Sequence, residues 1–392
     1  MRNVAFMTPD LKSGGSERVA SRLTKLLSER YNVFYIVFGN DDKSYEIAGK
    51  LINLNVPSTP VKWKRYINIV RKRIKLRRVC RENNIDILFS FTYSANTTMR
   101  ISDLDCKCVG SCRGFADLRD NTVNYHKTVS SGADMLFNSK AMENFYLSKY
   151  PQDKDKVFTI ENLFDCADIE KKAKEELSEE EANFYSSHTV VSNCGTLNDQ
   201  KGQWDLIKSF ELLKEKVPDA GLVIVGHDGA YENDIRDMAE RSKYSADIMF
   251  TGYTANPFKY MYNSNVYALS SINEGFPNAL IEAMICSTPV VATDCQTGPF
   301  EVLSDEKSTV HPSDGYILSE NGILTPCFDG RVDFDLDNKN ENHRIFADAL
   351  AKILTDTGLA KQYTEKGQKR AYQNDESLIN EQYFDFIESR FR

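Results

Sequence analysis

Residues 266–293 read V-Y-A-L-S-S-I-N-E-G-F-P-N-A-L-I-E-A-M-I-C-S-T-P-V-V-A-T. The apolar run at 266–270 predicts a strand, residues 278–286 have the apolar spacing of a helix, and 289–293 form a second apolar run. Strand, helix and strand in this order make a βαβ unit, whose two strands run parallel in one sheet. The expected fold class is therefore α/β.

The same alternation extends from this unit through the chain. Strand-like runs at 3–7, 33–38 and 86–91 alternate with helical patterns in the first half, and runs at 190–194, 221–226 and 248–252 do so in the second. A polar segment, residues 157–165 followed by the Glu- and Lys-rich residues 171–187, interrupts the rhythm. We therefore expect two doubly wound domains, residues 1–165 and 166–375, followed by a C-terminal segment at 376–392.

The composition is that of a folded globular protein. The chain has 392 residues, 41% of them hydrophobic, and a net charge of -8, which argues against a surface for nucleic acid. No apolar run reaches the 18 or so residues of a membrane span, and the N-terminus lacks the pattern of a signal peptide. Nine cysteines without zinc-site spacing indicate reduced thiols, so we expect a cytoplasmic protein.

Two carboxylates bracket the predicted start of the helix at 278–286. Asn278 is expected to cap this helix, so that backbone N–H groups of residues 276–280 favour an anion. Glu282, one turn inside the helix, could then accept hydrogen bonds from a ribose, while Glu274 faces a sugar. Taken alone, the two residues also allow a structural interpretation, in which Glu274 caps and Glu282 is solvated.

The surrounding motifs resemble those of glycosyltransferase family 4. The resemblance rests on E-G-F-P-N-A-L-I-E-A-M at 274–284, G-P-F-E-V-L at 298–303, V-I-V-G-H-D-G at 223–229 and G-G-S-E-R-V at 14–19. It covers nearly the whole chain. It implies a GT-B fold, with two Rossmann-like domains that face a cleft, and retaining transfer from a nucleotide sugar. It also implies that the segment 376–392 packs back on the first domain.

The resemblance also implies roles for individual residues. Glu282 would hold the nucleotide ribose, Glu274 would contact the transferred sugar, and Lys201 would bind the diphosphate and stabilise its developing charge. Gly15 would let the N-terminal loop approach the diphosphate. The remaining donor-binding positions would contribute through the loop and the helix start; they are Gly275, Phe276, Pro277, Asn278, Ala279 and Leu280.

Two positions depart from the family pattern. Thr196 stands where the family usually has an arginine of the diphosphate site. Arg113, in G-S-C-R-G at 110–114, stands where many members have a histidine near the reacting sugar. Because arginine cannot act as a base at neutral pH, we expect Arg113 to hold phosphate or acceptor. A purely structural role is the alternative.

No metal or cofactor is expected beyond the nucleotide sugar. The five histidines lack ligand spacing. Three Asp-x-Asp pairs could suggest a metal-diphosphate site, but they lie in charged segments that we expect to be exposed; they are Asp103/Asp105, Asp153/Asp155 and Asp333/Asp335.

A basic stretch lies at Lys62 to Arg78, with nine Lys or Arg residues and interleaved apolar side chains. On a helix, Ile67, Val70 and Ile74 would form an apolar stripe flanked by cations, which is typical of helices that lie on anionic membranes. The alternative is a helix packed on the core with a solvated basic side. Both interpretations can hold at once.

The expected function is that of a retaining, metal-independent glycosyltransferase. By its resemblance, it would move a sugar from a UDP-sugar to a hydroxyl of a glycan or polyprenyl-linked glycolipid during synthesis of a bacterial surface polysaccharide such as capsule or O-antigen. It would act in the cytoplasm or at the inner face of the cell membrane. The alternatives are a non-catalytic nucleotide-sugar-binding or scaffold protein and a nucleotide-sugar epimerase of the same fold. A glycan phosphorylase would need a pyridoxal-binding lysine or free-phosphate site, for which no motif is present.

Overall fold

The computed structural model describes residues 1–11, 15–39, 45–57, 59–304 and 308–391. The chain forms two compact units, Met1–Leu163 with Ser377–Arg392, and Phe164–Glu376. The first unit ends two residues before the expected boundary at 165. Phe164 belongs to the second unit because its N–H donates to Asn374 O (2.9 Å) and its carbonyl accepts from Glu376 N (2.8 Å).

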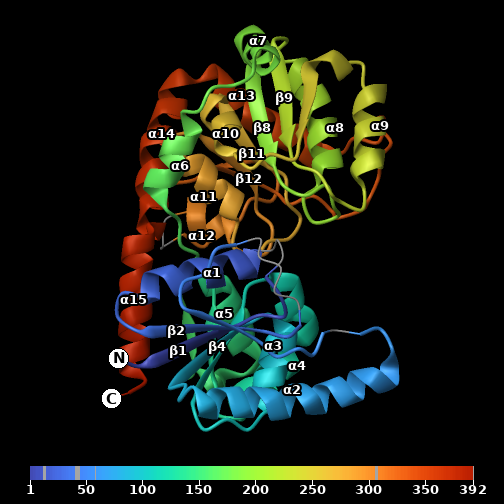
Figure 1. The fold of residues 1–392 in the computed structure, drawn as a ribbon. Coiled ribbons are helices and arrows are strands. Elements are labelled where there is room, and N and C mark those ends of the chain that lie inside the picture. The colour runs from blue at the N-terminus through green and yellow to red at the C-terminus, as the bar shows by residue number, and fades with distance from the viewer. Residues whose placement is uncertain (12–14, 40–44, 58, 305–307, 392) are drawn as a thin grey trace. The chain divides into compact units, whose positions relative to one another are not determined.

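The first unit is a doubly wound sheet of seven parallel strands in the order β3-β2-β1-β4-β5-β6-β7 (Figure 1). Its strands are β1 (Asn3–Met7), β2 (Asn32–Val37), β3 (Lys50–Asn53), β4 (Ile87–Phe91), β5 (Lys107–Cys112), β6 (Asp134–Phe137) and β7 (Val157–Thr159). Its helices are α1 (Gly15–Leu27), α2 (Lys62–Glu82), α3 (Tyr93–Ile101), α4 (Phe115–Ser130), α5 (Lys140–Lys149) and the C-terminal α15 (Glu376–Ser389).

The second unit repeats this design with the strand order β10-β9-β8-β11-β12-β14-β13, in which only β13 is antiparallel. Its strands are β8 (Thr189–Cys194), β9 (Ala220–Val225), β10 (Ile248–Gly252), β11 (Val266–Leu269), β12 (Val290–Thr293), β13 (Ile317–Leu318) and β14 (Ile323–Thr325). Its helices are α6 (Cys166–Ala173), α7 (Glu179–Ser187), α8 (Gln203–Lys214), α9 (Glu232–Arg241), α10 (Phe258–Asn263), α11 (Asn278–Ile285), α12 (Pro299–Leu303), α13 (Glu341–Thr355) and α14 (Thr357–Ala371).

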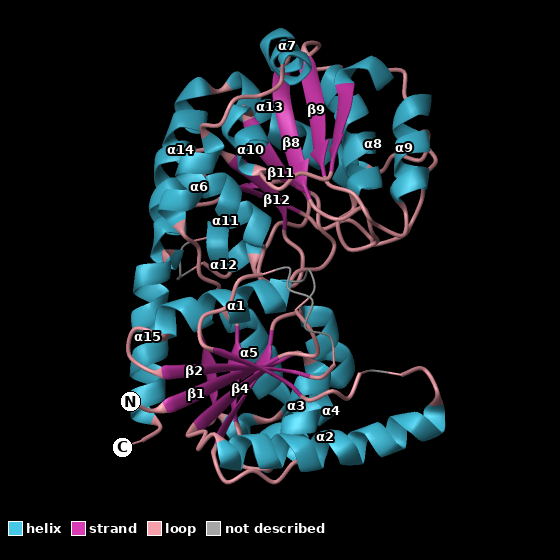
Figure 2. Ribbon diagram, in the orientation of Figure 1, coloured by secondary structure: helices cyan, strands magenta, loops and turns pink. Residues whose placement is uncertain are grey.

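The central strands have the composition of strands that are covered on both faces. All residues of β4 (I-L-F-S-F) and of β9 (A-G-L-V-I-V) are buried. Such near-continuous apolar strands are typical of parallel sheets between two helix layers, and helices lie on both faces of each sheet in Figure 2. The expected α/β class is confirmed.

The segment that was expected to interrupt the rhythm is ordered structure instead. Val157–Thr159 is β7, which pairs in parallel with β6, and the polar residues after it form α6 and α7. The expected interruption of the strand–helix alternation was wrong here, because a three-residue strand is too short to show a period of two. Ser178 and Glu181 form a capping box at the start of α7, which accounts for a helix among so many charged residues.

The C-terminal helix α15 completes the core of the first unit. Its apolar residues Ile379, Tyr383, Phe384 and Ile387 are buried in one cluster with strand residues of β1, β2 and β4. Arg2 at the start of the chain forms an ion pair with Glu388 near its end (2.7 Å). The first unit is therefore assembled from both ends of the sequence.

Candidate active site

Three loops meet at the carboxyl edge of the second sheet, where ligands bind in open α/β folds. They follow β8, β11 and β12. The strand β11 lies between the other two and pairs in parallel with both. Ile272 N donates to Gln200 O (2.8 Å), and Glu274 N donates to Gln296 O (3.1 Å). These bonds hold the three loops to one another.

Lys201 and Glu274 are brought together by these loops. Lys201 Nζ donates to Glu274 Oε1 at 2.6 Å, and the hydroxyl of Ser271 donates to the same oxygen at 2.7 Å. The side chains of Lys201 and Glu274 are only 23% and 10% exposed. Burial opposes the charge of Lys201, but the Glu274 carboxylate more than offsets it, so that the pKa of Lys201 is raised above its usual value.

Ser271 is the residue of this cluster that sequence reasoning missed. It is 1% exposed and precedes Glu274 by three positions. A Ser-x-x-Glu spacing is a known signal for side chains that hydrogen-bond locally, as in a capping box. With Oε1 held by two donors, the plane of the Glu274 carboxylate is set, and Oε2 accepts neither bond.

Glu282 lies on α11, one turn after the helix begins, as expected. Its exposure of 5% excludes the alternative of a solvated helix residue. Phe276 and Leu280, at 4% and 0% exposure, pack in the apolar cluster beneath this segment. Their side chains are therefore part of the core and can contribute to a donor site only through their backbone groups.

The expected cap of α11 was wrong. The helix begins at Asn278 and Pro277 occupies the N-cap position without a side-chain cap. Two backbone N–H groups that we expected to point out of the helix are engaged locally: Asn278 N donates to Phe276 O (2.9 Å) and Leu280 N donates to Pro277 O (3.0 Å). The tight turn at Pro277 uses these donors itself, which leaves fewer for an anion.

Two further predicted residues follow β8 and β1, and Gly15 lies in a helix rather than in the expected loop. Thr196 is exposed in the loop after β8 that also carries Lys201, and its carbonyl accepts from Gln203 Nε2 (3.3 Å). Gly15 is the first residue of α1, and a Cβ added there would meet nothing within 4 Å. Residues 12–14 of the glycine-rich loop lie outside the described residues.

Arg113 follows β5 at the carboxyl edge of the first sheet, the edge at which Gly15 also follows β1. Its guanidinium donates to Asn162 Oδ1 (2.5 Å) and to the hydroxyl of Tyr383 on α15 (2.9 Å). It also lies 5.2 Å from the centre of the Phe91 ring. These contacts support the structural alternative for Arg113, because they occupy two of its terminal donors.

The acidic pairs are used within the fold. Asp103 and Asp105 contact Arg77 (3.5 Å) and Arg81 (2.9 Å). Asp153 is buried, against expectation, because it accepts from Tyr146 and contacts His126. Among the described residues, no group of three or more His, Cys, Asp or Glu side chains is arranged to hold a metal ion.

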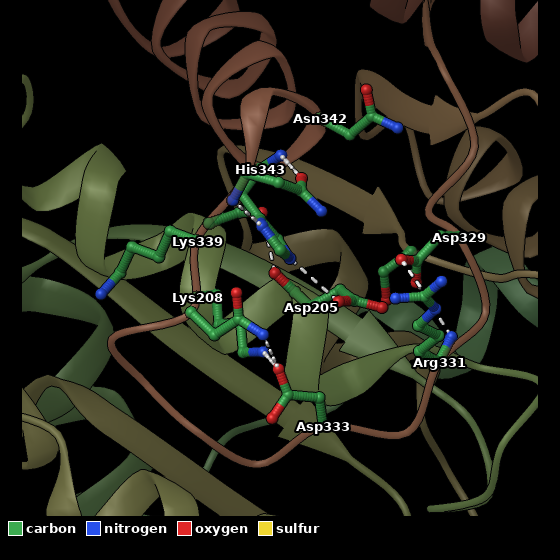
Figure 3. A network of polar contacts seen from close by, with 12 residues as sticks. Asp205, Lys208, Asp329, Arg331, Asp333, Lys339, Asn342 and His343 are labelled. Carbon is green, nitrogen blue, oxygen red and sulfur yellow. Dashed lines mark hydrogen bonds and ion pairs between the residues drawn. The ribbon is translucent and has the colours of Figure 1, made fainter.

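A polar network beside the Lys201 loop ties α8 to the segment before α13 (Figure 3). His343 Nε2 lies 2.9 Å from Asp205 Oδ1, and His343 Nδ1 accepts from Asn340 N (2.9 Å). The buried ammonium of Lys208 contacts Asp333 (2.9 Å). Burial raises the pKa of Asp205, and the His343 hydrogen bond opposes this rise.

None of the described helices is long and apolar enough to cross a membrane. The longest of them, α2, is instead basic and exposed. Its exposed apolar side chains are Trp63 (61%), Tyr66 (74%), Ile67 (48%), Ile69 (42%), Val70 (55%) and Ile74 (61%). The predicted stripe of Ile67, Val70 and Ile74 therefore faces solvent, while Leu76 and Cys80 pack on the core.

Two family models match the chain. Residues 13–168 match the model of Glycosyltransferase Family 4, and residues 174–323 match that of Glycosyl transferases group 1. An uncharacterized glycosyltransferase of Methanocaldococcus jannaschii is 29% identical over an alignment of 391 positions, gaps included, which covers 93% of this chain and 93% of the relative. The N-acetylgalactosamine-N,N'-diacetylbacillosaminyl-diphospho-undecaprenol 4-alpha-N-acetylgalactosaminyltransferase of Campylobacter jejuni is 25% identical over 386 residues, which cover 95% of each.

Solved structures with the same fold cover the whole chain. HepE of Anabaena in complex with UDP has a TM-score of 0.73 at 18% identity and covers 99% of this chain and 100% of its own. Sucrose-phosphate synthase of Thermosynechococcus elongatus has a TM-score of 0.77 at 16% identity, covering 100% and 99%. At these identities the likeness shows the fold alone, and the expected GT-B fold is confirmed.

Proposed function

We propose, from the premise that this chain belongs to glycosyltransferase family 4, that it moves a sugar from a UDP-sugar to a hydroxyl of a glycan or polyprenyl-linked glycolipid, with retention at the anomeric carbon. The observation that carries the proposal is the cluster of Lys201, Ser271 and Glu274. A half-buried ammonium and an oriented carboxylate share one edge of the second sheet with the buried Glu282. This pairing suits a ligand with a diphosphate at one end and sugar hydroxyls at the other.

The arrangement accounts for the groups that transfer requires. The ammonium of Lys201 has three N–H donors, of which Glu274 uses one, so the others can reach the diphosphate. As the bond from the anomeric carbon to the diphosphate oxygen breaks, negative charge grows on that oxygen, and a preplaced cation stabilises it. The acceptor hydroxyl forms the new bond on the same face, and its proton passes to the departing phosphate oxygen.

Glu274 would fix the sugar during this step. Ser271 and Lys201 hold Oε1, so Oε2 is oriented to accept from a sugar hydroxyl. Because Thr196 stands where the family usually has an arginine, the negative charge of the leaving group must be stabilised by Lys201 and by backbone dipoles. We further propose that no metal takes part, since the cation of Lys201 already serves this purpose.

The choice of donor and acceptor draws on the relatives. HepE is solved with UDP, and the Campylobacter jejuni relative is named for a diphospho-undecaprenol acceptor. We extend both to this chain as a UDP-sugar donor and a lipid-linked acceptor. Its site of action would then be the inner face of the cell membrane.

The donor site is tested by a thermal-shift screen of UDP-, GDP- and ADP-sugars, with and without EDTA. A donor at a hundred-fold excess over its Kd should stabilise the protein by about 2.7 kcal/mol. The shift should survive EDTA and vanish in Glu282→Gln, but persist in Glu240→Gln, a control on the exposed face of α9. Binding of no nucleotide, or binding only with metal, would contradict the donor site.

Transfer itself separates the proposal from its two alternatives. With the identified donor and a panel of lipid-linked glycans, a transferase gives a glycosylated product whose anomeric configuration matches that of the donor. A non-catalytic binder gives a thermal shift without product. An epimerase releases UDP or an isomerised sugar without any acceptor.

We also propose that α2 is the surface that contacts an anionic membrane. Six exposed apolar side chains share this helix with a cluster of lysines and arginines, and charge complementarity selects anionic lipid as the partner. Lysine and arginine attract the headgroups, and the apolar residues enter the headgroup region. The alternative of a helix whose apolar stripe packs on the core does not fit the exposure of Ile67, Val70 and Ile74.

The two tryptophans of the chain provide a built-in probe for this contact. Trp63 is 61% exposed on α2, whereas Trp204 is fully buried on α8. Vesicles of phosphatidylglycerol should shift the emission of Trp63 to the blue, and vesicles of phosphatidylcholine should not. Trp63→Phe should abolish the shift without abolishing binding, and Ile74→Glu should weaken binding. An unchanged spectrum and no cosedimentation would overturn the proposal.

A further inference from the structure

A cavity of about 570 Å³ lies in the first unit, at the amino ends of β5 and β6. Its wall is built from the end of α3, from the loops that lead into the two strands, and from the residues around the end of α15. Arg113 follows β5 at the opposite edge of the same sheet. The cavity is therefore separate from the groups that the proposed function uses.

Three cations line this cavity. They are Arg100 near the end of α3, Lys107 at the start of β5, and Arg390 just after α15. The side chains of Arg100 and Lys107 have no hydrogen bond or ion pair with any residue that the structure describes. Two positive charges at one cavity are thus uncompensated, which favours a ligand with negative charge.

The arginines of this region also have buried donors without acceptors. Nε of Arg100 and Nε of Arg390 are buried and donate to no acceptor among the described residues. The same is true of Arg77, which contacts Asp103 in the cavity wall (3.5 Å). Of the four described arginines with such an Nε, only Arg113 lies elsewhere. Buried donors almost always have a partner, so three of them around one cavity indicate a missing acceptor.

The acidic residues of the wall do not cancel the positive charge. Asp103 contacts Arg77, and Asp134 lies 3.5 Å from a terminal nitrogen of Arg390. Each carboxylate thus has an arginine as its partner, whereas the other two cations of the cavity have none. An anion bound here would complete the charge balance.

Arg390 is held in position before any ligand binds. Its guanidinium carbon lies 4.4 Å from the centre of the Phe158 ring and 4.9 Å from that of Phe386. Contacts of a guanidinium with aromatic rings are favourable, and with the Asp134 contact they restrict the side chain. A ligand of Arg390 therefore has little side-chain freedom to remove, which favours binding.

We infer that this cavity binds a small organic phosphate. A guanidinium presents two parallel N–H groups to two phosphate oxygens, and the lysine adds a point charge. The cavity has the volume of pockets for organic ligands, about 300–1,000 Å³, and its wall includes the apolar side chains of Met99 and Leu104. The phosphate would contact the three cations, and the organic part would lie on this apolar side. The inference does not rest on the proposed function.

Calorimetric titration of the full-length protein tests the ligand class, with glycerol 3-phosphate, inorganic phosphate and glycerol as probes. We expect glycerol 3-phosphate to bind, inorganic phosphate to bind more weakly, and glycerol not to bind. Lys201→Met, which removes the cation of the proposed donor site, should leave this binding unchanged. No binding of glycerol 3-phosphate, or binding that Lys201→Met abolishes, would overturn the inference. Equal affinity for the two phosphates would overturn the organic part of it.

Charge variants test the place of the site. Arg100→Gln and Lys107→Gln should each raise the Kd for glycerol 3-phosphate about ten-fold, the usual effect of losing one hydrogen bond to a charged group. Arg119→Gln is the matched control, since it removes the same charge from an exposed position of the same unit, outside the cavity wall. An equal loss in Arg119→Gln would mean that overall charge and not this cavity binds the phosphate, and would overturn the inference.

A third measurement uses only the wild type and does not depend on how well the variants fold. Phenylglyoxal modifies arginine side chains, and peptide mapping gives the rate at each position. Glycerol 3-phosphate at ten times its Kd should slow the modification of Arg100 about ten-fold, because only the free protein reacts. The rate at Arg119 should not change. Equal rates at Arg100 with and without the phosphate would contradict its place in the site.

Discussion

At the scale of the residue, Glu274 owes its orientation to neighbours on two loops. The roles proposed for Glu274 and Lys201 rest on the resemblance of their motifs, which lie 73 positions apart in the sequence. The direct contact of the two residues could not be predicted, because no pattern tells which loop ends meet. Ser271 was missed for a related reason: a buried hydroxyl has no signature apart from its spacing to Glu274.

The cation of Lys201 should be essential for the rate. Lys201→Met removes the charge that we propose stabilises the leaving group, and one of the two donors to Glu274. We expect kcat to fall about 100-fold or more, the usual effect of losing one such donor. Ser271→Ala keeps the cation and should cost less, mainly in KM. Steady-state kinetics with the identified donor check both, and a Lys201→Met enzyme with unchanged kcat would exclude Lys201 from the chemistry.

Substitution by alanine should affect donor binding at Gly15 and the stability of the fold at Gly202. A Cβ on Gly15 meets nothing, so Gly15→Ala should leave stability unchanged within about 0.5 kcal/mol and weaken only donor binding. Gly202 has φ +60 and its added Cβ would lie 2.4 Å from Ser270 O, so Gly202→Ala should destabilise the protein by about 1 kcal/mol or more.

The two glycine variants are compared by denaturant unfolding and by calorimetric titration with the donor. Unchanged donor affinity in a stable Gly15→Ala protein would remove Gly15 from the donor site. Unchanged stability in Gly202→Ala would show that the loop after β8 yields more easily than its contacts indicate.

At the scale of the element, the long alternating segments were predictable and the short ones were not. The strands β1, β8 and β10 and the helix α11 lie within about one residue of expectation, because each has a clear apolar period. The strands β3, β7, β13 and β14 were missed, since two to four residues carry too little pattern. Only the cap of α11 was misjudged, because Pro277 and not Asn278 occupies the N-cap position.

The pair of Lys208 and Asp333 should make stability depend on acid. The Lys208 hydrogen bond lowers the pKa of Asp333, so the pair stabilises the fold above the ordinary pKa of about 4. This contribution is lost as the pH falls through the lowered pKa. Asp333→Asn leaves the Lys208 ammonium, 2% exposed, without its partner and should cost on the order of 3 kcal/mol at pH 7.

Urea unfolding at pH 7 and again at low pH measures this effect. The difference between the wild type and Asp333→Asn should shrink as the pH falls, whereas Asp335→Asn, at an exposed neighbouring position, should change little at either pH. A difference that stays constant with pH would mean that the ion pair is not its source.

At the scale of the whole molecule, the two units could be predicted from the repeated alternation, but the place of α15 could not. Only the family resemblance led us to expect it on the first unit, because its apolar residues fit any core. In the structure Tyr383 of α15 packs in the core of the first unit, where it contacts Arg113 and the ring of Phe89. Shortening the chain after Glu376 should therefore destabilise the first unit and spare the second.

Calorimetry and limited proteolysis of the shortened chain check this expectation. Removal of four fully or nearly buried side chains, each worth about 1.5–3 kcal/mol, should lower the first unit's transition far below that of the second. Tyr383→Phe, which loses only the bond to Arg113, should cost about 1 kcal/mol. Equal destabilisation of both units would contradict the division of the core described above.

The return of α15 also sets an order of events during synthesis. On the ribosome, the strands of the first unit emerge early, but the α15 residues that complete its core are translated only after the whole second unit. The second unit lies wholly within the intervening stretch and can finish folding first. The unit that begins to emerge first is thus completed after the unit that follows it, and until then its apolar core residues lack the cover of α15.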